Sequence, residues 1–190
     1  MILLASSSAR RKEILSFFSI PFETVSPPFD EDSIAPTLTP QDYVLAIAEG
    51  KAHSIDSNRP ILTADTTVYF QGEFLGKPKN YEAAKECLSM LSGQTHQVYT
   101  GVAVKFKGNT YTSFEKSDVE FHSYSTLEIE NYIRGIHVFD KAGAYAIQGK
   151  GGLIVKAIHG CYYNVMGLPL KALQETLLKA ADIDLWNYLD

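Results

Sequence analysis

Apolar residues at the start of the chain form a continuous run and then recur at helical spacing. Residues 2–5 are apolar without interruption, which predicts a short buried strand, and a serine cluster follows at positions 6–8. A second apolar set then has the period of a helix and consists of Ile14, Leu15, Phe17 and Phe18. The pattern predicts a strand, a turn and a helix as the first structural unit.

Prolines and acidic residues interrupt the pattern over residues 21–40, which predicts a loop. Acidic residues occupy positions 30–32. The prolines around them include Pro27, Pro28 and Pro36. Thr39 followed by Pro40 is typical of a helix start, and we expect this helix to end near His53. Its apolar face consists of Tyr43, Val44, Ile47 and Ala48.

Strand and helix patterns alternate through the middle of the chain. Residues 61–70 have strand character, Gly72 marks a turn, and residues 81–91 return to helical spacing. Residues 98–106 and 111–122 carry the clearest hairpin signal, because glycine and asparagine lie between them. We expect two long antiparallel strands here.

The last third of the chain is predicted to contain two helices around a glycine-rich segment and a strand. Residues 126–134 form the first helix, with Thr126 as its cap. Residues 142–152 are rich in glycine, and residues 153–158 form the last strand. Residues 169–181 form the last helix. Its expected inward residues are Leu170, Leu173, Leu177 and Leu178.

Helices combined with both hairpin and separated strands predict an α/β fold with a mixed sheet. The chain has 190 residues, of which 45% are hydrophobic, and this suits one globular domain over residues 1–190, or two lobes that share a core. The formal net charge of -5 argues against stable nucleic-acid binding. We also expect no membrane span, because the apolar runs are too short.

The two cysteines, Cys87 and Cys161, lie far apart and outside any metal-binding or redox motif. A disulfide framework would need more cysteines in a shorter chain, so a reducing, cytoplasmic location is expected. The five histidines show no spacing typical of a zinc site. The serines at positions 6–8 also lack the sequence setting of a serine nucleophile.

Basic residues follow the serine cluster at the predicted junction of strand and helix. Ser8 is followed closely by Arg10, Arg11 and Lys12. Free N–H groups at a helix start favour anions, whereas three cations there are unfavourable unless they meet an anion. A phosphate site is therefore one interpretation. A serine-capped surface helix with solvated basic residues is an equally good one.

Asp65 is a carboxylate inside an otherwise apolar and hydroxylic strand, where an unpaired charge is costly. We expect it to have a partner or a chemical task. It could hold a divalent cation or accept a proton from an attacking water. The alternative is a strand-end aspartate that accepts hydrogen bonds from backbone N–H groups.

Three further charged residues are weaker candidates. Lys77 lies on a turn between Gly76 and Pro78, and Lys51 on the second helix is taken alone as part of a solvated face. Glu31, in the acidic loop, could reach a metal, although a solvated acidic loop is the commoner meaning of such a pattern.

Small residues surround a single amide in the segment 140–149. Gln148 offers both a donor and acceptors, which is the chemistry needed to recognise the edge of a base. The small residues permit close approach of the backbone. The alternative is structural, with Asp140 and Lys141 as an ion pair and the glycines as breaks.

Five segments together resemble the Maf family of nucleotide pyrophosphatases. They occur in family order and cover most of the chain between residue 2 and about residue 173. The segments are LLASSSARRKEIL, LTADTTVYFQGEFLGKP, LSGQTHQVYTGVAV, DKAGAYAIQGKGG and YYNVMGLPL. The resemblance implies an elongated α/β fold like that of inosine-triphosphate pyrophosphatases, with two lobes around a cleft. It also implies a Mg²⁺ or Mn²⁺ cofactor and a homodimer.

The resemblance also assigns roles to residues. It makes Asp65 the proton acceptor and implies phosphate contact for Arg11, Lys51 and Lys77. The family branch that hydrolyses dTTP and UTP carries arginine, threonine and glutamine at three positions, which match Arg10, Thr66 and Gln148. The resemblance therefore implies a pyrophosphatase that converts these nucleotides to the monophosphate and pyrophosphate.

Two other functions remain open at this stage. The branch that prefers 7-methyl-GTP has a similar fold but usually carries glutamate in place of the residue matched by Gln148. The family was also named for an influence on septum formation, so a nucleotide-binding regulator without turnover is the second alternative. One departure from the family concerns metal binding. Ile136, His137 and Val138 stand where the family commonly has Gly-Glu-Pro, so the glutamate of that motif is absent here and cannot bind a metal.

Overall fold

The structure of the chain is a computed structural model that describes residues 1–35 and 37–189. Pro36, one of the prolines used to predict the first loop, lies outside the described residues. The strands are β1 (Ile2–Ala5), β2 (Phe22–Val25), β3 (Ile61–Phe70), β4 (Glu73–Leu75), β5 (Thr95–Phe106), β6 (Asn109–Phe121) and β7 (Val155–His159). The α-helices are α1 (Ala9–Leu15), α2 (Pro40–His53), α3 (Tyr81–Leu91), α4 (Thr126–Gly135), α5 (Tyr162–Met166) and α6 (Leu170–Ala181). Short 3₁₀ helices are η1 (Glu31–Ser33), η2 (Ala142–Ala144), η3 (Gly149–Ile154) and η4 (Leu185–Tyr188).

The described strands form one mixed sheet of seven strands in the order β2-β1-β3-β5-β6-β7, with β4 paired to β3. Strand β1 pairs in parallel with β2 and with β3, whereas β3 with β4 and β6 with β7 are antiparallel. Strands β5 and β6 are joined by Lys107 and Gly108, whose φ angles of 49° and 82° suit a tight hairpin turn. The predicted α/β class with a mixed sheet is therefore confirmed.

The chain divides into two compact units. Unit 1 comprises Met1–Asp65, Thr100–Glu115 and Gly167–Asp190. Unit 2 comprises Thr66–Tyr99 and Lys116–Met166. The boundaries fall inside β3, β5 and β6, so each of these strands contributes one part to each unit.

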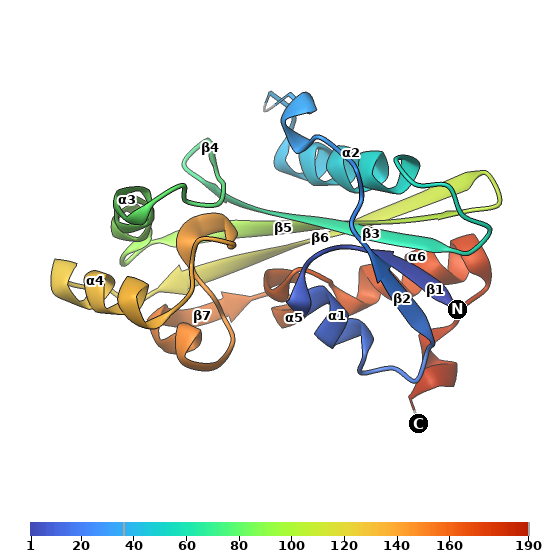
Figure 1. Cartoon of the computed structure of the whole chain (residues 1–190). Coiled ribbons are helices and arrows are strands. Elements are labelled where there is room, and N and C mark those ends of the chain that lie inside the picture. Colours follow the sequence, from blue (N-terminus) through green and yellow to red (C-terminus); the bar gives the residue numbers. More distant parts are fainter. Residues whose placement is uncertain (36, 190) are drawn as a thin grey trace. The chain divides into compact units, whose positions relative to one another are not determined.

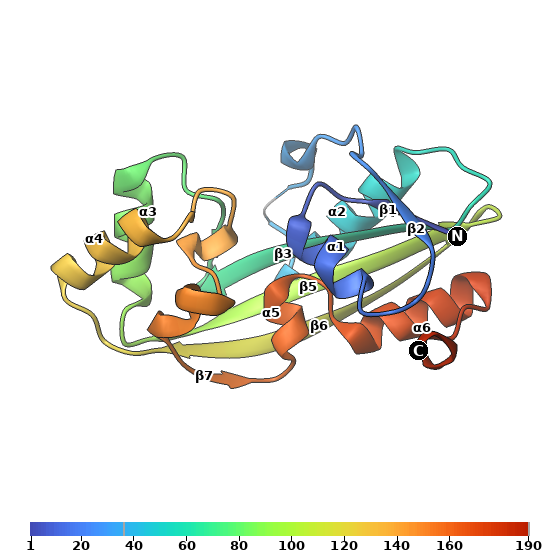
Figure 2. The ribbon, with the colours of Figure 1, turned by 60° about the horizontal axis from the view of Figure 1, so that its bottom comes forward.

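Within unit 1, helix α2 covers one face of the sheet, and α1 and α6 lie on the other (Figure 1, Figure 2). The contact between α2 and the sheet is close, because a Cβ atom on Gly101 of β5 would lie 2.6 Å from the carbonyl oxygen of Val44. The hydroxyl of Thr63 in β3 donates to the carbonyl of Ala48 at 2.6 Å. Helix α2 is therefore held directly against β3 and β5.

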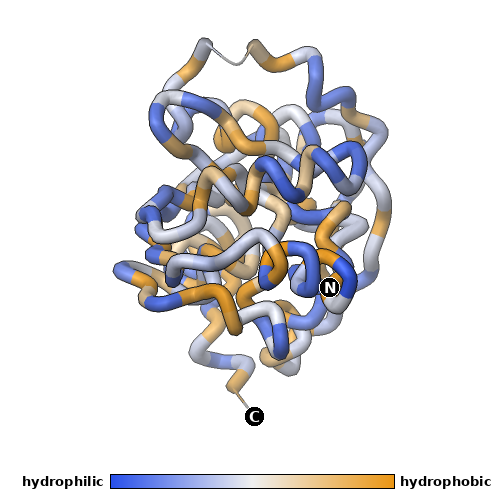
Figure 3. Tube along the Cα trace, turned by 90° about the vertical axis from the view of Figure 1, so that its left-hand side faces the viewer, coloured by the Kyte–Doolittle hydropathy of each residue, from blue (hydrophilic) through white to orange (hydrophobic). Residues whose placement is uncertain are grey.

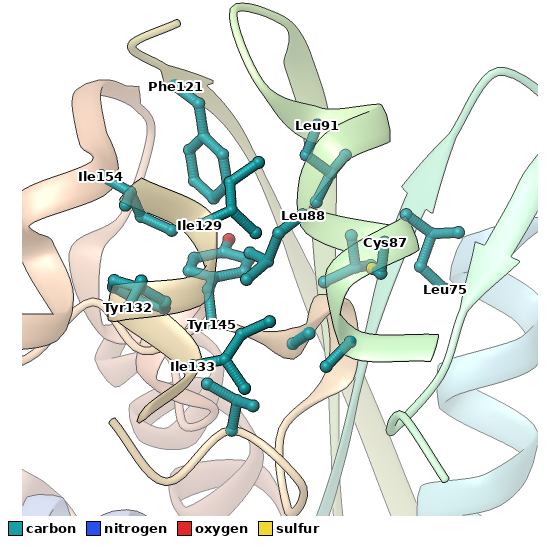
Figure 4. Close-up of a cluster of buried hydrophobic side chains, with 14 of the residues drawn as sticks. Leu75, Cys87, Leu88, Leu91, Phe121, Ile129, Tyr132, Ile133, Tyr145 and Ile154 are labelled. Carbon is teal, nitrogen blue, oxygen red and sulfur yellow. The ribbon is translucent and has the colours of Figure 1, made fainter. Parts of the chain in front are cut away.

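Unit 2 has its own hydrophobic core, which α3 and α4 build with the adjoining strands (Figure 4). Phe121 and Tyr145 pack edge to face with ring centroids 4.9 Å apart. Burial raises the pKa of the Cys87 thiol in this core to about 11, so Cys87 is a packing residue at neutral pH. Both Cys87 and Cys161 are free thiols.

Several short elements were missing from the prediction, and for β2 the structure shows the physical cause. The predicted loop over residues 21–40 contains β2 and η1, and β4 and α5 were also missed. Strand β2 lacks apolar alternation because it lies at the end of the strand order, with only intermediate or exposed residues. Its pairing with β1, rather than its own pattern, makes it a strand.

Helix ends were also misplaced at particular residues. The cap of α4 is Ser125 rather than Thr126, and it forms a capping box with Glu128. Helix α1 ends at Leu15, which leaves Phe17 exposed. Leu178 of α6 is exposed rather than inward-facing. The last strand begins at Val155 because η3 occupies the preceding residues.

Hydrophobic stretches along the chain are short and are interrupted by hydrophilic residues (Figure 3). Over residues 1–35 and 37–189, none of the helices has both the length and the apolar character needed to cross a membrane.

Candidate functional site

A buried lysine joins two carboxylates in unit 1. Nζ of Lys51 lies 2.8 Å from Oδ1 of Asp65 and 2.7 Å from Oε1 of Glu31. The side chains of Lys51 and Asp65 are 8% and 11% exposed, whereas that of Glu31 is 45% exposed. Lys51 comes from α2, Asp65 from β3 and Glu31 from η1. Together they form a charged cluster in which Glu31 is the residue in contact with solvent.

The expectation that Lys51 belongs to a solvated face was wrong. Val44, Ile47 and Ala48 are buried, and Lys51 continues the same spacing toward the end of α2. Because the helix backbone is pressed against β3 and β5, a residue on this face meets the sheet rather than water. The spacing contained this signal, since Lys51 follows Ile47 by four residues and lies on its face.

Asp65 has the partner that its strand position required. A carboxylate that is nearly removed from water needs a counter-charge, and Lys51 supplies it by donating a hydrogen bond at 2.8 Å. The pair is compact enough that a third charged group, Glu31, reaches the same ammonium. Asp65 is therefore held in one place by its contact with Lys51.

Glu31 is the predicted metal residue, and in this structure it contacts Lys51. Within the described residues, no group of three or more histidine, cysteine, aspartate or glutamate side chains is arranged to hold a metal. Mg²⁺, however, is usually bound by one or two carboxylates together with substrate phosphates and waters. Glu31 and Asp65 share one ammonium and so lie close together, which fits a cation of that kind once phosphate supplies the other ligands.

Arg11 is anchored at the start of α1. Its Nε donates to the carbonyl oxygen of Gly167 at 2.8 Å, and its Nη1 donates to Oγ of Ser6 at 3.3 Å. Burial lowers the pKa of Arg11. The Asp65 carboxylate raises this pKa, and the positive charge of Arg10 lowers it further. The guanidinium is thus a fixed cation that interacts electrostatically with Asp65.

Ser8 is the cap of α1, as the serine-capped interpretation expected. Its Oγ accepts a hydrogen bond from the N–H of Arg11 at 3.4 Å, and the N–H of Ser8 donates to Oγ of Ser6 at 3.2 Å. The Ser8 side chain thus occupies one of the free N–H groups at the start of α1, and α1 is short, with only seven residues. The guanidinium of Arg11, rather than the helix end itself, is therefore the stronger candidate for binding an anion.

Tyr43 belongs to this charged cluster and was missed by sequence reasoning, which placed it only on an apolar helix face. Burial raises its pKa, and the carboxylates of Asp65, Glu31 and Asp32 raise it further. Tyr43 precedes Lys51 by eight residues, so both lie on one face of α2. The carbonyl of Gly167 was also missed, because nothing in the sequence links it to Arg11.

Three predicted site residues belong to unit 2. Thr66 follows Asp65 directly in β3, Lys77 is exposed after β4, and Gln148 precedes η3. The turn that carries Lys77 is tied to η2, because the N–H of Gly143 donates to the carbonyl of Gly76 at 3.2 Å. The structure thus places Lys77 beside the glycine-rich segment that leads to Gln148.

The expected ion pair between Asp140 and Lys141 is present at the start of that segment. Nζ of Lys141 contacts Oδ1 of Asp140 and donates to the carbonyl of His137 at 2.6 Å. The pair lies directly before η2. The candidate site residues are therefore divided, with Ser8, Arg10, Arg11, Glu31, Lys51 and Asp65 in unit 1 and Thr66, Lys77 and Gln148 in unit 2.

The chain was compared with family models, curated proteins and solved structures. A family model described as Maf-like protein matches residues 1–180. Proteins named dTTP/UTP pyrophosphatase from Bacillus cereus strains ATCC 14579 and G9842 are each 45% identical over 186 residues, which is 96% of both chains. A solved HAM1 protein from Coxiella burnetii aligns over 63% of this chain and 72% of its own, with 16% identity and a TM-score of 0.41. With a family match over nearly its whole length and relatives at 45% identity, this chain belongs to the Maf family.

Proposed function

We propose that this chain is a nucleoside triphosphate pyrophosphatase that hydrolyses dTTP and UTP to the monophosphate and pyrophosphate. The proposal is supported by relatives of that name at 45% identity over 96% of the chain. The structural observation that carries it is the ammonium of Lys51 held between Asp65 and Glu31. A base and a phosphate-binding cation in contact are what hydrolysis of a phosphate anhydride requires.

The charges of unit 1 suggest how the site works. A triphosphate carries several negative charges, and Arg11 and Lys51 are the fixed cations of unit 1 that would receive them. When phosphate oxygens contact Lys51, the ammonium shares its hydrogen bonds between the phosphate and Asp65. Asp65 then accepts a proton from the attacking water while the bond between the first and second phosphates breaks.

A divalent cation, Mg²⁺ or Mn²⁺, is part of the proposal. Glu31, which shares the ammonium of Lys51 with Asp65, is the residue that would hold it. Bound there, it would neutralise charge on the phosphate oxygens. Glu31 has the exposure needed to turn toward such an ion, whereas Asp65 is fixed by its strand.

Selectivity for the base is proposed to depend on Arg10, Thr66 and Gln148. Gln148 provides an amide with two donor hydrogens and an acceptor oxygen, which suits the edge of a pyrimidine. It lies between η2 and η3, and the next residue, Gly149, has open space where a side chain would be. The amide is the group that would distinguish pyrimidines from 7-methyl-GTP.

The proposal also includes the cellular context. Two free thiols support a reducing compartment such as the cytoplasm. The net charge of -5 disfavours nucleic acid as a partner. A homodimer is proposed from the family resemblance alone.

The test is pyrophosphate release from a panel of dTTP, UTP, CTP, ATP, GTP and 7-methyl-GTP, each with Mg²⁺ and with Mn²⁺. We expect the highest kcat/KM for dTTP and UTP, and no release after chelation of the metal. Preference for 7-methyl-GTP would assign the chain to the other branch. Tight nucleotide binding without turnover would instead favour a regulatory protein. A parallel preparation of Asp65→Asn shows whether a contaminating enzyme produces the signal.

A further inference from the structure

The residues around Gln148 form a closed loop in unit 2. The N–H of Gly151 donates to the carbonyl of Gln148 at 3.1 Å. The two ends of the loop, residues 146–151, touch each other, because a Cβ atom on Gly151 would lie only 2.6 Å from Cβ of Ala146. A side chain at position 151 would therefore force the ends apart.

A single hydroxyl group holds both ends of this loop. The hydroxyl of Tyr132 lies 2.9 Å from the carbonyl oxygen of Gly151 and 3.3 Å from that of Ala146. It also accepts a hydrogen bond from the N–H of Ala146 at 3.2 Å. Its one hydrogen goes to the nearer oxygen, on Gly151, so the phenol bridges Ala146 to Gly151.

Tyr132 is itself immobilised by its surroundings. It lies on α4 with Ile129 and Ile133, and all three side chains are buried in the core of unit 2 (Figure 4). Burial raises the pKa of Tyr132 to about 12, so the hydroxyl keeps its hydrogen at neutral pH. The loop is therefore hydrogen-bonded to a residue of α4 that is buried in the core of unit 2, rather than to another loop.

The chain is also fixed just before the loop. The hydroxyl of Tyr145 lies 2.9 Å from Nε2 of His96 in the same core. Ala144 has a φ of 59°, a left-handed conformation that a residue with a side chain rarely adopts. Such a backbone persists only where its surroundings impose it, and it often accompanies a functional segment.

From this arrangement we infer that Tyr132 is a positioning residue for base selectivity, acting through the loop that presents Gln148. The inference rests on the proposed function, because it concerns how that function selects pyrimidines. Tyr132 does not itself contact the base. Its hydroxyl sets the distance between the loop ends and thereby the position of the amide of Gln148.

The test is Tyr132→Phe, which removes the hydroxyl and keeps the buried ring. Losing the bridge leaves the loop less ordered, so we expect KM for dTTP and UTP to rise about tenfold, with kcat changed by less than about twofold. The kcat/KM for 7-methyl-GTP should stay near that of the wild type. The ratio between pyrimidines and 7-methyl-GTP therefore falls about tenfold.

Tyr124→Phe is the matched control. The hydroxyl of Tyr124 donates to the carbonyl of Leu153 at 3.0 Å, outside the loop. The same chemical change there should leave the substrate ratio as in the wild type. An equal fall in both variants would show that loss of any tyrosine hydroxyl in this region loosens the fold, and the inference would be overturned.

A second approach applies even if Tyr132→Phe folds poorly. Gly151→Ala forces the loop ends apart while Tyr132 remains, and it should lower the same ratio. Hydrogen exchange adds a direct measurement, since the amide of Ala146 should exchange faster in Tyr132→Phe. A wild-type substrate ratio in Gly151→Ala or in folded Tyr132→Phe would overturn the inference and leave the proposed function intact. No pyrimidine preference in the wild type would defeat the proposed function and the inference together.

Discussion

Nζ of Lys51 lies 2.8 Å from Oδ1 of Asp65, and both side chains are almost removed from water. A buried ammonium and a buried carboxylate stabilise each other only while both are present, because either one alone would be an uncompensated charge. Glu31 extends the pair toward solvent at 2.7 Å. The residues proposed for catalysis are therefore also part of the stability of unit 1, and substitutions there affect both.

Asp65→Asn tests the proposed base. The amide keeps the shape of the side chain but cannot accept a proton from water, so kcat should fall by at least about 100-fold while nucleotide binding is retained. Pyrophosphate release and calorimetric titration measure the two effects. Asp118→Asn is the control, because Asp118 pairs with Lys116 at 3.1 Å and has no proposed role. A kcat above about a tenth of the wild-type value in Asp65→Asn would reject Asp65 as the proton acceptor.

Lys51→Met tests the structural role of the ammonium. Removing it leaves Asp65 buried without its partner and facing Glu31, which should lower the free energy of unfolding by about 3 kcal/mol. Urea denaturation measures the change. In the control, Lys156→Met removes an exposed lysine paired with Glu120 at 2.8 Å and should cost less than about 1 kcal/mol. Equal losses in the two variants would mean that the Lys51 pair is no stronger than a surface pair.

Gln148→Glu tests how the base is recognised. The carboxylate loses both donor hydrogens and places a negative charge against the acceptors of a pyrimidine. We expect kcat/KM to fall at least about tenfold for dTTP and UTP and much less for 7-methyl-GTP. The comparison between substrates is essential, because an added charge also repels every triphosphate. A uniform fall across the panel would place Gln148 near phosphate or metal instead.

The burial of His96 leads us to expect that the folded state is less stable in acid. Burial lowers its pKa from 6.5 to about 4, against a smaller opposing effect of Asp118. The unfolded chain binds this proton more readily, so the folded state loses stability as the pH falls from 6.5 toward 4, by about 3 kcal/mol in total.

Urea titrations at several pH values measure the loss caused by His96. In His96→Gln the slope between pH 6.5 and 4 should be smaller, whereas His122→Gln, at an exposed position, should retain the wild-type slope. The same slope in wild type and His96→Gln would assign the acid sensitivity to other groups.

Much of the secondary structure was predictable because its signals are local. The helix start at Thr39 and Pro40, the helix Tyr81–Leu91 and the hairpin turn at Lys107 each depend on residues within a few positions of one another. Periodicity and turn chemistry express such short-range preferences directly. The motifs around Asp65 and Gln148 were visible for the same reason.

Local patterns were therefore enough to predict the α/β class, most elements and the candidate residues, whereas the fold determines which of these residues are in contact. Lys51 changed from a surface residue to the partner of Asp65 because close packing of α2 on β3 and β5 removes that helix face from water. The role inferred for Tyr132 depends on α4, which places its hydroxyl between the ends of the Gln148 loop. Both contacts join residues that are distant in sequence, and their formation depends on how complete elements pack, which no local spacing encodes.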